Sequence, residues 1–147
     1  MKTPLLLSLP LAAALSACTM MGPPTTLTFK HNPVTADPQA MGMAVVTTGM
    51  DGMLTTTLNL TGLTPGKTYA AHYHAFGPDS ATDPCASNGP VSLGFPSFTA
   101  DAAGRATVSV TSDPAKTAGN LGAYINVHYG DDLQVIPLCA PIRTSRT

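Results

Sequence analysis

The chain has 147 residues, a formal net charge of −1 and only 10% charged side chains. This length fits a single domain with a core of ordinary size. The near-neutral charge, without a basic cluster, excludes the electropositive surface by which proteins attract nucleic acid, so nucleic acid is not expected as a partner.

The first residues have the layout of a secretory signal. Lys2 precedes an apolar stretch at residues 4–15 that is too short to span a bilayer as a permanent helix. The small residues before Cys18 resemble a bacterial lipobox, in which the cysteine is acylated and becomes the first residue of the mature protein. The alternative is an ordinary signal peptide with a cysteine nearby by chance.

We therefore expect a signal peptide at residues 1–17, a lipid on Cys18 and a tether at residues 18–26. The lipid would anchor the protein to a membrane of the cell envelope, on the periplasmic side. Residues 27–147 are expected to form one domain, because no internal repeat or low-complexity segment interrupts them.

The composition and periodicity of this domain favour β-strands. The chain contains 13 Gly and 14 Pro, which disfavour helices. Side chains alternate with a period of two at residues 27–30, 41–46, 54–60, 106–111 and 123–128. Turn-forming residues such as Asp51-Gly52 separate these stretches. Seven or eight short strands at this spacing predict an all-β sandwich or closed barrel.

Two histidines, His72 and His74, stand two residues apart in a predicted strand at residues 68–76. Side chains at positions i and i+2 of a strand project from the same face, so both imidazoles could converge on one metal ion while Tyr73 points away. Such pairs also occur solvated and without a metal, which is the alternative interpretation.

A third histidine, His128, lies in another predicted strand, on the same face as Tyr124 and Asn126. If the fold brings the two strands together, three imidazoles meet. Imidazole binds copper, zinc, iron and nickel, so the type of ligand does not by itself choose the metal.

The cysteine count favours one disulfide. If Cys18 carries lipid, Cys85 and Cys139 remain as an even pair. An exported chain meets an oxidising compartment, where such a pair is usually bonded. Two buried free thiols are the alternative.

Five motifs, in chain order, resemble the copper-zinc superoxide dismutase family. They are the glycine-containing turn at 60–66 with the His-x-His-x-Phe-Gly stretch at 72–77, Cys-x-x-x-Gly-Pro at 85–90, the Thr-Ala-Asp hairpin at 98–108, Val-His followed by Asp-Asp-Leu at 127–133, and Cys139. The resemblance covers about residues 54–140.

This resemblance implies a Greek-key β-barrel or sandwich of about eight antiparallel strands. It also implies that His72, His74 and His128 bind one copper ion and that Cys85 pairs with Cys139.

The sequence departs from the family pattern at three positions. Val91 stands where the family has a histidine that bridges copper and zinc, Gly94 where it has a zinc aspartate, and Ile136 where it has an active-site arginine. The two loops that carry zinc and steer the anionic substrate are nearly absent. We therefore expect that the protein binds no zinc and does not dismutate superoxide rapidly.

Three functions are compatible with these observations. The first is a copper-only superoxide dismutase of low activity. The second is a non-catalytic periplasmic protein that sequesters or delivers copper ions. The third is a metal-free structural domain, since residues 125–128 resemble the last strand of a related bacterial β-domain class.

Other possible metal ligands receive less support. Met41 and Met43 could offer thioethers to Cu(I), but we expect them to alternate into the core as space-filling side chains. His31 ends the first predicted strand and is expected to be a surface residue and not a fourth ligand.

Overall fold

The computed structural model describes residues 22–32, 34–35, 37–76, 85, 89–119 and 122–142. The predicted signal peptide and the predicted lipidation site, Cys18, lie outside the described residues. In the part of the chain that is described, no helix is long and apolar enough to cross a membrane.

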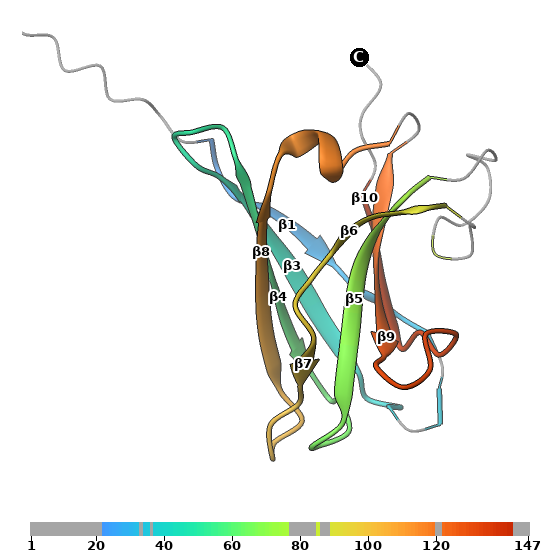
Figure 1. The fold of residues 1–147 in the computed structure, drawn as a ribbon. Coiled ribbons are helices and arrows are strands. Elements are labelled where there is room, and N and C mark those ends of the chain that lie inside the picture. The colour runs from blue at the N-terminus through green and yellow to red at the C-terminus, as the bar shows by residue number, and fades with distance from the viewer. Residues whose placement is uncertain are drawn as a thin grey trace, which may run out of the picture.

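Antiparallel β-strands account for nearly all of the regular structure (Figure 1). In the described residues the strands are β1 (Thr25–Thr28), β2 (Lys30–His31), β3 (Met41–Thr48), β4 (Leu54–Thr61), β5 (Thr68–Ala75), β6 (Val91–Gly94), β7 (Phe98–Thr99), β8 (Ala106–Ser112), β9 (Ala123–Tyr129) and β10 (Leu138–Ile142), with one short 3-10 helix, η2 (Pro114–Lys116).

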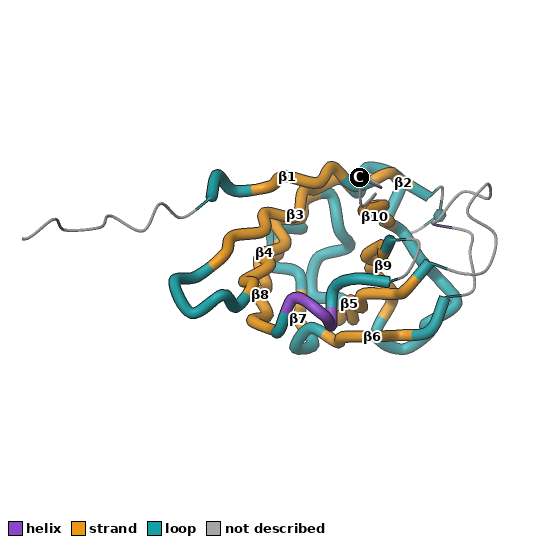
Figure 2. The backbone as a smooth tube through the Cα atoms, turned by 90° about the horizontal axis from the view of Figure 1, so that it is seen from above, coloured by secondary structure: helices purple, strands orange, loops and turns teal. Residues whose placement is uncertain are grey.

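The strands form two sheets that face each other. One sheet has the order β1-β3-β4-β8, and the other has the order β2-β10-β9-β5-β6 with β7 also paired to β5. Figure 2 shows the two layers from above. Because β4 lies beside β8 and β5 beside β9, the chain crosses between the sheets, as in Greek-key connections.

The expected all-β, antiparallel architecture is confirmed, and of the two forms considered the molecule adopts the sandwich. At one edge, β1 and β2 are consecutive in the chain and belong to different sheets. At the other edge, β6 and β7 both pair with β5, and no described residues pair either of them with β8. The sheets therefore do not close into a barrel.

The core lies between the sheets and is built from their inward faces. Leu58 and Leu60 of β4 meet Tyr73 of β5 and the aliphatic side chains of β9, and these residues are almost completely buried. Burying side chains of this size stabilises the fold by about 1.5–3 kcal/mol each. Thr56 and Tyr73 share a buried hydrogen bond of 2.7 Å between their hydroxyl groups, which links β4 to β5.

The expectation that Met41 and Met43 fill the core is wrong. Their side chains are 59% and 47% exposed, whereas Ala44 of the same strand is fully buried. Leu60 on the paired strand occupies the space on the inner side of β3, since a Cβ atom on Gly42 would lie 2.6 Å from Leu60 Cδ2. Small residues must therefore face inward on β3, and the methionines face outward.

We predict that Tyr73→Phe lowers the free energy of unfolding by about 1–3 kcal/mol, because the buried Thr56 hydroxyl then lacks its partner. Urea denaturation would measure the change. The double variant Thr56→Val/Tyr73→Phe should regain part of the loss, and Thr57→Val, on the outward face of the same strand, should have little effect. Additive effects of Thr56→Val and Tyr73→Phe would contradict the coupling.

Candidate metal centre

Two neighbouring strands of the second sheet bring the three predicted histidines together. His72 and His74 project from β5, and His128 projects from β9. In the antiparallel pairing of these strands, His128 lies opposite Ala70, so it is a diagonal neighbour of His72. One ring nitrogen from each histidine lies within 4.8 Å of those of the other two.

Backbone carbonyl groups orient two of the imidazoles. Nδ1 of His74 donates a hydrogen bond to the Gly89 carbonyl at 3.2 Å, and Nδ1 of His128 donates one to the Leu133 carbonyl at 2.7 Å. A carbonyl oxygen can only accept, so each ring carries its proton on Nδ1 and presents a bare lone pair on Nε2. This is the arrangement in which protein carbonyls usually hold metal-binding histidines.

The Nε2 atoms of His74 and His128 are buried, and neither has a hydrogen-bond partner among the described residues. Leaving a buried acceptor unpaired is unfavourable, so such atoms in folded proteins call for an explanation. A metal ion bound by both atoms would satisfy both lone pairs. The donor set therefore fits a metal ion that prefers neutral nitrogen ligands.

Burial also keeps the imidazoles neutral. Loss of solvation lowers the pKa of His72, His74 and His128 below the ordinary value for histidine. The neighbouring histidines lower the pKa of His72 and His128 further, while the hydrogen bond to Leu133 opposes the effect at His128. Metal binding requires deprotonated imidazole, so the cluster is in the required form near neutral pH.

The histidines line a cavity of about 420 Å3. The described part of its wall comes from β5 and β9, from Cys85, Gly89 and Val91, and from the loop at 130–137 between β9 and β10. The lining residues are His72, His74, Cys85, Gly89, Val91, Tyr124, Asn126, His128, Leu133, Gln134 and Ile136. Of the residues that the structure describes, no lysine, arginine, aspartate or glutamate lines the cavity.

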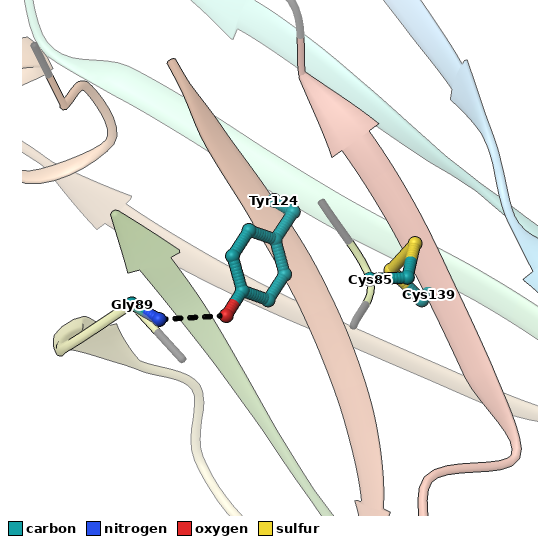
Figure 3. Close-up of a disulfide and its surroundings, with 4 residues drawn as sticks. All are labelled: Cys85, Gly89, Tyr124 and Cys139. Atoms are coloured by element: carbon teal, nitrogen blue, oxygen red, sulfur yellow. Dashed lines mark hydrogen bonds between the residues drawn. A yellow bond between two sulfur atoms is a disulfide. The ribbon is translucent and has the colours of Figure 1, made fainter. Parts of the chain in front are cut away.

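A disulfide fixes one side of this cavity. Cys85 is bonded to Cys139 of β10, with the α-carbons 5.7 Å apart, so the predicted pairing is confirmed (Figure 3). The bridge ties Cys85 of the cavity wall to a strand adjacent to β9. On the chain-entropy model, closing a loop of this length stabilises the fold by about 4 kcal/mol.

Gly89 and Tyr124 support His74 in a way that sequence reasoning missed. The Gly89 amide donates a hydrogen bond of 3.3 Å to the Tyr124 hydroxyl, as Figure 3 shows. The Tyr124 ring stacks on His74, with centroids 5.0 Å apart. A Cβ atom on Gly89 would lie 1.4 Å from the Ala75 carbonyl oxygen, so only glycine fits.

The remaining candidate ligands do not join the cluster. His31 is exposed, and its Nε2 donates a hydrogen bond to the Asp37 carbonyl at 2.9 Å. Met41 and Met43 belong to the other sheet. Val91 and Ile136 line the cavity, and Gly94 lies beside His72, where a Cβ atom would be 3.6 Å from its ring.

Comparison with known families gives a different assignment from the one that the motifs suggested. The CHRD domain matches residues 24–132. No curated protein matches the chain.

The resemblance to copper-zinc superoxide dismutases is therefore wrong as a family assignment. The motifs that suggested it lie in turns, in alternating strands and at a disulfide, which unrelated β-sandwich proteins can share. Val91, Gly94 and Ile136 are consequently not replacements of lost zinc and guidance residues.

We predict that the metal-free protein loses stability as the pH falls below about 6.5, the ordinary pKa of histidine in an unfolded chain. Because burial lowers the folded-state pKa of the three histidines, the unfolded state binds more protons in this range, and unfolding is favoured. Urea midpoints between pH 8 and pH 5 would measure the effect. The triple variant His72→Asn/His74→Asn/His128→Asn should lose less stability over this range, and equal losses would contradict the account.

Proposed function

The chain belongs to the CHRD domain family, and we propose that this member binds one copper ion through His72, His74 and His128. The proposed role is non-catalytic: the protein sequesters or delivers copper in the cell envelope, where a lipid on Cys18 would anchor it. One observation carries the proposal. Two buried Nε2 atoms lack hydrogen-bond partners among the described residues, while the Nδ1 atoms of the same rings are held by carbonyl groups.

The composition of the cavity wall favours copper over zinc. A closed structural zinc site usually has four protein ligands, whereas here three imidazoles meet, no carboxylate lines the described part of the wall, and Cys85 is engaged in a disulfide. For a given nitrogen site, divalent copper binds more tightly than divalent zinc. Three neutral imidazoles suit copper in both of its common oxidation states.

Superoxide dismutation is not part of the proposal. The family resemblance that suggested it is wrong, and among the described residues no cationic side chain lines the cavity to attract an anion. Asp131, in the loop that contributes Leu133, forms an ion pair with Lys67 at 3.1 Å, so this lysine is engaged by a carboxylate.

We predict that the metal-free full chain binds one equivalent of copper, and that His128→Ala weakens binding by about 100-fold or more, because one of the two oriented Nε2 ligands is lost. Isothermal titration with a competing chelator would measure both affinities. Zinc should bind the wild-type protein more weakly than copper does.

His31→Ala is the matched control, since His31 lies outside the cluster. It should leave copper affinity unchanged. Equal copper affinity for the wild-type protein and the His128→Ala variant, or equal losses in the two alanine variants, would overturn the proposal.

A further inference from the structure

The side chain of Asn126 occupies the floor of the histidine cavity. On β9, Asn126 stands between Tyr124 and His128 in the alternation, so the three side chains share one face. Its pairing partner on β5 is His72, and its partner on β10 is Cys139 of the disulfide. Asn126 therefore lies beside His72 of β5, near His128 of its own strand, and beside the Cys85–Cys139 disulfide.

Asn126 is a buried polar residue whose amide oxygen lacks a partner in the described part of the chain. Only 4% of its surface is exposed, and its Oδ1 atom has no hydrogen-bond partner among the described residues. Structural asparagines in a protein interior normally have such partners. Asn126 lines the histidine cavity, so the position of its amide oxygen indicates a hydrogen bond to a ligand bound in that cavity.

The same cavity wall contains the unpaired Nε2 atoms of His74 and His128. Three histidines leave at least one position of a copper ion open to an exogenous ligand, as three-ligand sites do. A ligand in that position shares the cavity with the amide of Asn126. The amide of Asn126 has an Nδ2 group that donates and an oxygen that accepts, and the oxygen is the buried atom without a partner among the described residues, so it favours a ligand that carries a proton.

We infer that Asn126 selects the exogenous ligand of the copper site: its amide oxygen accepts a hydrogen bond from a protic ligand such as water and disfavours small aprotic anions. This inference rests on the proposed copper binding. It makes Asn126 a specificity-determining residue, and not a fourth protein ligand. Superoxide is a small aprotic anion, so the same contact disfavours its approach to copper.

Azide is the probe that tests this inference, because it is a small aprotic anion that binds Cu(II) and changes its visible absorption. Asn126→Leu removes the amide at similar volume. In the copper-loaded full chain, this variant should retain one copper ion and bind azide at least about 10-fold more tightly than the wild-type protein does, which corresponds to about 1.4 kcal/mol. Asn59→Leu, at an exposed position of the other sheet, should leave azide affinity unchanged.

Asn126→Asp is a second variant that keeps the shape of the side chain. A carboxylate facing the copper ion should alter the electron paramagnetic resonance spectrum of Cu(II) and weaken azide binding. This variant decides the question if Asn126→Leu fails to fold.

The outcomes separate the two proposals. Copper bound by the wild-type protein and by both variants, with unchanged azide affinity and unchanged spectra, would overturn the role of Asn126 alone. Absence of copper binding by the wild-type protein would overturn the proposed function and the role of Asn126 together.

Discussion

Strands β5 and β9 lie side by side in the second sheet, and their antiparallel register determines both the packing of the core and the position of the three histidines. Their inward side chains, including Tyr73, Ile125 and Val127, belong to the core. Their outward side chains include the three histidines. Because the side chains of a strand alternate, a slip of one residue in this register would place core residues outside and histidines inside. Packing of the core therefore fixes the geometry of the candidate site.

The outer face of this pair of strands is covered as well, although it is polar. All seven residues of β9 are buried. Among the described residues, the cover includes the disulfide-bonded Cys85, Gly89, Val91 and the loop at 130–137. The same backbone carbonyl groups that belong to this cover orient His74 and His128. The segments that cover the cavity therefore also orient the imidazole rings of His74 and His128.

Sequence reasoning succeeded where the relevant physics is local. Alternation with a period of two predicted the strands and the shared face of His72 and His74, and the cysteine count predicted the disulfide. It failed for Met41 and Met43, because the face of β3 that turns inward depends on Leu60 of the paired strand. It also missed the Gly89 and Leu133 carbonyl groups, since main-chain acceptors have no signature in the residue types. The family assignment failed because short strand and turn motifs report architecture more than ancestry.

A crystal structure of the copper-loaded protein is the most direct test of the central claim, that the buried nitrogen atoms of this cluster are metal ligands. We predict one copper ion bonded at about 2.0 Å to Nε2 of His74, to Nε2 of His128 and to a ring nitrogen of His72. Copper located elsewhere, for example at Met41 and Met43, with ordered water on the two Nε2 atoms, would contradict it.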